Sequence, residues 1–418
     1  MKSLLNLLKI LLLAGIFIPL TGCWDQNEID KRAYVVGIGI DKAEKEGKLK
    51  ITYLISNPEV ASIQQGGSTD EPPHEIITFE ASSFISSRDM ANSVIAKTIT
   101  YDILDVIIVS EEVARDKDFI RYIYDATKDR EIRRDTKLVV TKENASKFIE
   151  RNKPTLETRL HEYFELILEN TKNIGLTPSS ELNVFFRITE ADADLFLAIY
   201  ATAEHEEDPP LRENEDDILA GEIKIQGKTN PSQILGSAVF KEGQMIGTLT
   251  GEETRLVQAL NKTMQMSKFF SSVPDPFMDH TRVAIRVKEK ADPTIKVDVS
   301  KPAPKIDVTI PLEVEVLSDH SMVNYAEHKD KRDKLKQVIK ERIEEKYKEL
   351  VKKTQEEFKA QPFGFSLSAR RHFLTIPQWE NYDWFNSYPE AEVNVKVDIT
   401  LGEFGRQTEL PRHDKIRD

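Results

Sequence analysis

The 418-residue chain has a single cysteine, Cys23, and its longest apolar run, residues 10–20, has only about 11 residues. A lone cysteine cannot form an internal disulfide, and zinc or redox sites usually use at least two thiols or a group of Cys and His. At ~1.5 Å per helical residue, the apolar run is too short for the ~30 Å hydrocarbon core. The body of the protein must therefore be stabilised by buried apolar cores, and Cys23 must act alone.

Basic residues are in the minority. The chain has 58 Lys and Arg against 71 Asp and Glu, a net charge of −13. This balance disfavours nucleic acid as a partner, because phosphates require a basic face, and it disfavours binding of anionic lipid through the whole surface. The proportions of hydrophobic (39%) and charged (31%) residues are typical of a globular protein, and the length favours two or three domains.

Catalytic and cofactor motifs are also missing from the sequence. It contains no Gly-rich phosphate loop ending in Lys-Ser/Thr, no Gly-x-Ser-x-Gly and no His-Glu-x-x-His. His161 is expected on a polar or packed helix face rather than as a ligand, and His205 in a solvated acidic loop rather than a cation site. Asp192 and Asp194 lack the second acid that hydrolysis would require. We therefore expect no enzyme activity, no metal and no cofactor.

The first residues have the pattern of a lipoprotein signal peptide. Lys2 and Lys9 precede the apolar run, and Leu20-Thr21-Gly22-Cys23 matches the bacterial lipobox, in which the cysteine sulfur takes a diacylglyceryl group and becomes the new N-terminus. We predict that residues 1–22 are removed and that Cys23 anchors the chain to the outer face of a membrane. The alternative is an ordinary secretory signal with a chance cysteine at the cleavage point.

Hydrophobic periodicity predicts an α+β, multi-domain protein with mainly antiparallel sheets flanked by helices. Residues 33–42 and 48–56 read as a hairpin, 181–190 and 194–204 as strand or helix-to-strand material, and about 325–358 as a long amphipathic helix in the C-terminal domain. The acidic, Pro-containing segment near 204–217 is the expected boundary. The predicted divisions are a signal peptide (1–22), an N-terminal region of one unit or two subdomains (23–203), an acidic linker (204–221) and a C-terminal domain (222–410).

A late aromatic stretch, IPQWENYDWFNSYPE, contains Trp379, Tyr382, Trp384 and Phe385. Exposed aromatic side chains of this kind often anchor protein interfaces. The alternative is that they close the C-terminal core. The sequence leaves both interpretations open.

The chain resembles the spore germination Ger(x)C lipoprotein family, the C subunits of nutrient-germinant receptors in endospore-forming bacteria. The resemblance spans nearly the whole chain, with one departure at AQPFGFS, where Gln361-Pro362 replaces the usual Asp before a Phe-Gly or Gly-Phe turn. It begins at GCWDQNEIDKRAYVVGIGIDK and continues through DREIRRD (129–135), GSAVFKEGQMIGTLTGEET (236–254) and IPQWENYDWFNSYPEAEVNVKVDI (376–399).

This resemblance implies a lipid-anchored, non-enzymatic receptor subunit required for spore germination. It would lie on the outer face of the spore inner membrane and act by association with two integral membrane receptor subunits; whether it contacts a small molecule is left open. A solute-binding lipoprotein of a transporter is the main alternative, although the sequence does not show two similar lobes and a hinge. An anchored hydrolase is a third, without candidate catalytic residues.

Overall fold

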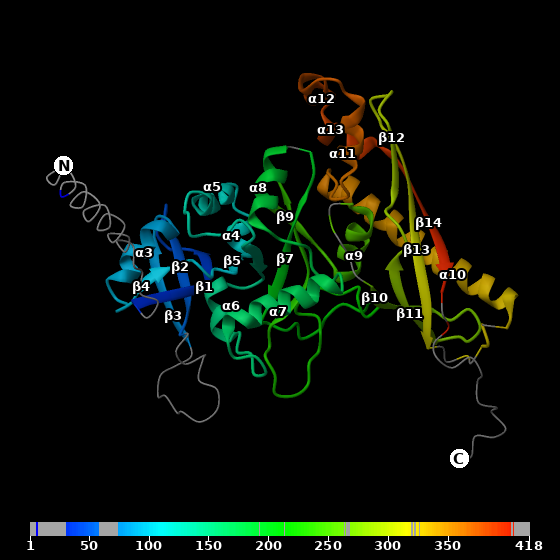
Figure 1. Cartoon of the computed structure of the whole chain (residues 1–418). Helices are drawn as coiled ribbons and strands as arrows, with labels where there is room; N and C mark the ends of the chain where they lie inside the picture. Colours follow the sequence, from blue (N-terminus) through cyan, green and yellow to red (C-terminus); the bar gives the residue numbers. More distant parts are fainter. Residues whose placement is uncertain are drawn as a thin grey trace, which may run out of the picture.

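A computed structural model of the chain describes residue 6 and residues 31–57, 74–191, 193–212, 214–262, 264, 268–318, 321, 323–325, 327–402 and 404. These residues form two β-sheets with helices packed against them, side by side along the length of the molecule (Figure 1). The expected α+β class is confirmed. Within these ranges, no helix combines the length and the apolar character needed to cross a membrane.

The first sheet has the strand order β3-β2-β1-β5-β6-β7-β8-β9, with β4 beside the start of β1. Its outer strands pair antiparallel, but β1, β5, β6 and β7 run parallel at its centre, which the sequence did not indicate. The strands are β1 (Arg32–Lys42), β2 (Leu49–Ser56), β3 (His74–Ala81), β4 (Thr98–Thr100), β5 (Val106–Ser110), β6 (Lys137–Thr141), β7 (Phe196–Thr202), β8 (Gln233–Lys241) and β9 (Gln244–Leu249).

Helices cover both faces of this sheet, so its central strands are apolar on both sides. In β5, Ile107 and Val109 belong to one core, whereas Val106 and Ile108 belong to the other. The first core includes residues of α3, α4, α5 and α8, and the second includes residues of α6 and α7. The helices are α3 (Phe84–Asn92), α4 (Glu111–Ala114), α5 (Phe119–Ile123), α6 (Ala145–Arg151), α7 (Leu160–Asn173) and α8 (Leu182–Ala191).

The GIGID motif of β1 has a structural role. Asp41 is fully buried and accepts hydrogen bonds from the backbone N–H groups of Ala145 and Ser146, at 2.6 Å and 2.9 Å, in the first turn of α6. A carboxylate at a helix N-terminus is favoured by the free N–H groups and the helix dipole. A Cβ atom at Gly39 would lie 2.8 Å from Ile149 Cδ1, so glycine lets α6 pack closely on the strand. The motif therefore joins a helix to the sheet.

The acidic segment 204–221 lies between two paired strands of one sheet. Strand β7 precedes it, β8 follows it, and the two pair antiparallel. Its last part packs against the protein: Asp216 is buried and forms a 2.6 Å ion pair with Arg255 of α9 (Gly251–Leu260). The end of the predicted acidic linker is thus attached to the rest of the protein, because Asp216 has a buried partner. Where the chain divides into independently folding parts stays a prediction.

The second sheet is formed after α9. Its strand order is β10-β11-β13-β12, and β14 pairs parallel with β13. The long helix α10 (Lys329–Lys353) packs against β14 and buries Leu335, Ile339 and Tyr347, which confirms the predicted long C-terminal helix. The strands are β10 (Phe269–Pro274), β11 (Arg282–Glu289), β12 (Thr294–Asp298), β13 (Lys305–Ser318) and β14 (Glu392–Leu401). Between α10 and β14 lies a group of short helices (Figure 1).

Candidate functional site

The predicted lipidation site, Cys23, lies outside the described residues, as does the predicted signal peptide apart from residue 6. The described N-terminal region begins at Lys31, directly before β1. Seven residues separate Cys23 from Lys31, and the eight Cα–Cα steps between them would reach at most ~29 Å when fully extended. Lipidation at Cys23 therefore remains a prediction, and it would hold the first sheet close to the membrane.

The predicted interface aromatics belong to the short helices α12 (Ile376–Tyr382) and α13 (Trp384–Ser387), which follow the short helix α11 (Phe365–Ala369). Thr375 caps α12: its hydroxyl accepts from the N–H of Gln378, whose side chain accepts from the N–H of Thr375 in return. Asp383, in a left-handed conformation, caps α13 by accepting from the N–H of Asn386. These caps fix the turns between the helices, and they decide which faces the side chains present.

The two tryptophans point into the core. Trp379 is 8% exposed and Trp384 is 3% exposed, and their rings stack with centroids 5.9 Å apart. Tyr382 and Phe385 are half-buried; the Tyr382 hydroxyl donates to the carbonyls of Lys301 and Pro302, and the Phe385 ring lies 4.7 Å from Lys241 Nζ. The interpretation of Trp379 and Trp384 as exposed interface anchors is therefore wrong. They close the C-terminal core, the alternative that the sequence left open.

The outer side of the same helices carries residues that the sequence analysis did not single out. We call this surface the apolar–basic tip; it consists of Leu367, Arg370, Arg371, His372, Leu374 and Ile376, all exposed. Leu374 lies between the 3₁₀ turn Arg370–His372 and the Thr375 cap of α12. The signal in the sequence was the run ARRHFLTIP, where basic and aliphatic residues precede the aromatics. Only the burial of the tryptophans shows which side faces outward.

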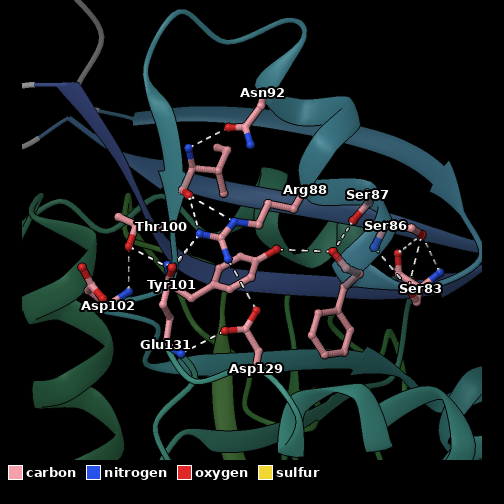
Figure 2. A network of polar contacts seen from close by, with 12 residues as sticks. Ser83, Ser86, Ser87, Arg88, Asn92, Thr100, Tyr101, Asp102, Asp129 and Glu131 are labelled. Carbon is pink, nitrogen blue, oxygen red and sulfur yellow. Dashed lines mark hydrogen bonds and ion pairs between the residues drawn. The ribbon is translucent and has the colours of Figure 1, made fainter. Parts of the chain in front are cut away.

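The DREIRRD stretch is held to the first sheet by Arg88 of α3, which lies between Asp129 and Glu131 in Figure 2. Arg88 Nη2 donates to Glu131 Oε1 at 2.7 Å, and Glu131 also accepts the N–H of Tyr101 and the hydroxyl of Thr100. Burial raises the pKa of Glu131, but the hydrogen bonds from Arg88 and from the Tyr101 N–H outweigh it, and the pKa is lowered. The carboxylate therefore remains ionised and ties three chain segments together.

An open groove of about 850 Å³ lies beside this stretch. Ile132, Leu182 and Phe186 provide apolar lining. The basic lining residues are Lys128, Arg130, Arg133, Arg134 and Arg187, all exposed, against the acidic Asp129 and Glu190. On an acidic protein this is a local concentration of positive charge, and arginine is suited to carboxylate and phosphate groups. The groove could receive an anionic group of a partner.

His161 contacts Asp105, with 2.6 Å between Nδ1 and Oδ2, beside a cavity of about 540 Å³. Burial raises the pKa of Asp105 although His161 lowers it. The hydroxyls that line the cavity donate elsewhere: Thr136 to Leu104 O, Ser179 to Glu181 and Ser180 to Leu138 O. A nucleophile activated by histidine would have to donate to the ring. The pair therefore has the geometry of a structural contact.

The other candidates from the sequence are dispersed. Asp192 lies outside the described residues, and Asp194 contacts the C-terminal part of the chain through Ser366. His205 Nδ1 lies 2.9 Å from Gln233 Nε2. In the part of the chain that the structure describes, no group of three His, Cys, Asp or Glu residues is placed to hold a metal ion.

Comparison with known proteins identifies relatives along nearly the whole chain. Residues 25–202 match the family described as the spore germination protein N-terminal domain, and residues 235–405 match the one described as spore germination B3/GerAC like, C-terminal. Spore germination protein B3 of Bacillus subtilis (strain 168) is 20% identical over 396 residues, 93% of this chain and 95% of that protein. The putative spore germination protein YfkR of the same organism is 21% identical over 93% of this chain and 94% of its own length.

A solved structure has the same fold. The crystal structure of the GerBC protein superposes with a TM-score of 0.51 at 16% identity, covering 90% of this chain and 99% of that one. The overall fold is therefore shared with a protein of clearly different sequence.

Proposed function

The chain belongs to the Ger(x)C family of spore germination proteins, the C subunits of germinant receptors, and from this premise we propose that it is a lipid-anchored, non-enzymatic subunit that acts by association with integral membrane receptor subunits. The observation that carries the proposal is the length of the relationship. Two family matches together span residues 25–202 and 235–405, and the alignments with spore germination protein B3 and YfkR cover 95% and 94% of those proteins.

The anchor is supported by the sequence before Cys23. Two acyl chains, at ~0.8 kcal/mol for each buried CH₂ group, hold a protein far more firmly than a single myristoyl chain. An anchored protein meets a membrane partner at a raised effective concentration, so a modest contact surface is enough for association. We place the chain on the outer face of the spore inner membrane, with two integral membrane subunits as its partners.

Action by association is supported by the polar groups of the described residues. Asp41 caps a helix, Glu131 joins three segments and Asp216 pairs with Arg255, so each of these carboxylates is engaged by a contact within the protein. Among the residues that the structure describes, the hydroxyls beside the His161–Asp105 pair donate to other groups. The basic groove beside residues 129–135 is a surface on which an acidic segment of a receptor subunit could bind.

A solute-binding lipoprotein remains the second candidate, and the architecture disfavours it. Such proteins close two similar lobes around a ligand. Here the first sheet is mixed, with helices on both faces, whereas the second pairs one long strand, β13, with β11, β12 and β14 and packs against a long helix. The two halves are not alike. Closure of one half on the other would therefore not form a ligand cleft between two similar lobes.

The test is a deletion of the gene in a strain that also lacks its sister receptors. We expect germination with particular nutrients to fail, while growth and sporulation remain normal. The full chain should restore the response, and a Cys23→Ala chain should restore it poorly and be released from the membrane. A normal nutrient response in the stripped strain, or turnover of a substrate by the purified protein, would reject the proposal.

A further inference from the structure

We propose that the apolar–basic tip is a membrane-contact site that binds the headgroups and outer acyl region of anionic phospholipid. The chain would then touch the membrane at a second point, remote in sequence from Cys23. This inference rests on the proposed function only in placing the chain at a membrane surface.

The first support is the exposure of the aliphatic side chains. Leu374 is 94% exposed, Ile376 is 59% exposed and Leu367 is 51% exposed, all within ten residues of sequence. Single exposed aliphatic residues are ordinary, but apolar side chains gathered on one projection mark an interaction surface. The core does not require them, since Trp379 and Trp384 fill it from the same helices. The group of short helices that carries them stands at one edge of the molecule (Figure 1).

The second support is the charge beside these residues. Arg370, Arg371 and His372 form an exposed 3₁₀ turn that ends two residues before Leu374. Among the described residues, no carboxylate lies within ion-pair distance of either arginine. Hydrogen bonds from Ser300, and to a lesser extent the nearby Lys301 and His372, lower the pKa of Asp298. Because Asp298 is the acidic neighbour of His372, the two arginines supply the uncompensated positive charge. Since the whole chain carries a net charge of −13, attraction to an anionic surface has to be local.

Exposed aliphatic side chains beside uncompensated arginines favour lipid over a protein as the partner of the tip. Aliphatic side chains can enter the boundary between headgroups and acyl chains while neighbouring arginines contact phosphates. Each basic residue near an anionic membrane surface strengthens binding about five-fold. The residues that dominate protein interfaces are tryptophan, tyrosine and arginine, whereas leucine is under-represented there. Here both tryptophans of the segment are turned inward, and the exposed apolar residues of the tip are leucine and isoleucine.

The chain offers matched controls. Leu156 and Leu211 are 102% and 103% exposed, yet each lies apart from such a turn; Leu156 precedes Glu157, and Leu211 follows the acidic run 204–208. A label at either position reports the general presence of a membrane. A label at Leu374 reports contact of the tip.

The experiment uses the full chain with Cys23→Ser, so that a polarity-sensitive fluorophore attaches only to a cysteine introduced by Leu374→Cys or, as the control, Leu211→Cys. Vesicles of phosphatidylcholine alone and with phosphatidylglycerol are floated, and emission is measured on the bound chain. We expect a blue shift and quenching by brominated lipid at position 374 with phosphatidylglycerol, and neither at position 211. Arg370→Gln and Arg371→Gln should each lower the inserted fraction about five-fold.

Four results would overturn the inference. An unshifted label at position 374 on vesicle-bound chain would show that the tip does not touch lipid, and so would failure of the chain to bind vesicles at all. Equal shifts in both vesicle types, unaffected by the arginine substitutions, would exclude recognition of anionic headgroups. A shift seen only after receptor subunits are added would identify the tip as a protein-binding surface. None of these results depends on the germination assay, so the proposed function is tested separately.

Discussion

Ser366 donates a hydrogen bond of 2.6 Å to the carboxylate of Asp194, joining residues 172 positions apart. The side chain of Gln361 also donates to Asp194, and its backbone carbonyl accepts the N–H of Leu195 at 2.9 Å. Gln361 Oε1 accepts the N–H of Phe363 at 2.7 Å. The turn at Gln361-Pro362, which departs from the usual family sequence, therefore connects the segment before β7 to the start of α11 by hydrogen bonds.

Replacing Asp194 should change how stability depends on pH. Burial raises the pKa of Asp194 to about 6, against the lowering effect of Ser366 and Gln361. Because this value lies above the unfolded value of about 3.9, the folded state binds the proton more tightly, and stability falls as pH rises from about 4 to about 6. Asp194→Asn should remove that decline, whereas Asp194→Ala should lower the free energy of unfolding by about 1–3 kcal/mol. Urea unfolding at pH 4 and pH 7 measures both, and an unchanged decline in Asp194→Asn would contradict the assignment.

Glu131→Gln should destabilise the first sheet, because it removes the charge that Arg88 and the Tyr101 N–H stabilise. We expect the free energy of unfolding at pH 7 to fall by about 2 kcal/mol. The lowered pKa of Glu131 means that its contribution is present above about pH 4.3 and is lost as pH falls through the folded-state value. Arg134→Gln, an exposed change in the same loop, is the control and should stay within about 0.5 kcal/mol. Equal effects of the two substitutions would argue against a joining role for Glu131.

Trp384→Ala should lower the free energy of unfolding by about 3–5 kcal/mol, because the ring is buried in the C-terminal core and stacks on Trp379. Leu374→Ala, at the exposed tip, should leave the free energy of unfolding within about 0.5 kcal/mol of wild type. Thermal or urea unfolding compares the two. A stable Trp384→Ala variant that fails only in binding would restore the interface interpretation of that tryptophan.

Limited proteolysis should cut first near Leu211, which is fully exposed in the segment 206–212, and should spare residues 214–220 around the buried Asp216. Since β7 and β8 pair across the cut, the two fragments should stay associated and elute together. Fragments that separate and fold alone would support the sequence-based boundary near 204–217. Early cleavage within 236–254 would contradict both descriptions.

Local patterns predicted the elements well where hydrogen bonding is between sequence neighbours. The hairpin expected at 33–42 and 48–56 is found as Arg32–Lys42 and Leu49–Ser56, and the long helix is found at Lys329–Lys353. Residues 181–190 and 194–204 were expected as strand or helix-to-strand, and the second alternative is confirmed, since α8 is followed by β7. Residues 182–191 form α8 despite their β-branched and aromatic residues, because Phe185 packs on Phe119, Phe196 and Phe240. Tertiary packing outweighed local propensity there.

The pairings between segments distant in the chain could not be predicted from the sequence. Nothing in the sequence indicates that β1 runs parallel to β5, or that Asp216 finds Arg255. The same limit applies to the candidate site. Its aromatic content identified the segment 376–390, but only the folded structure shows that Trp384 is buried and Leu374 exposed. Exposure is a property of the assembled molecule, so the tip could be found only from the structure.

The claim of association is tested most directly by purifying the tagged full chain from spore membranes under mild detergent and identifying by mass spectrometry what accompanies it. We expect two integral membrane receptor subunits in a fixed ratio to the chain, and a clear loss of both from a Cys23→Ala preparation. Recovery of the membrane-bound chain alone, or with the subunits of a transporter instead, would contradict the account.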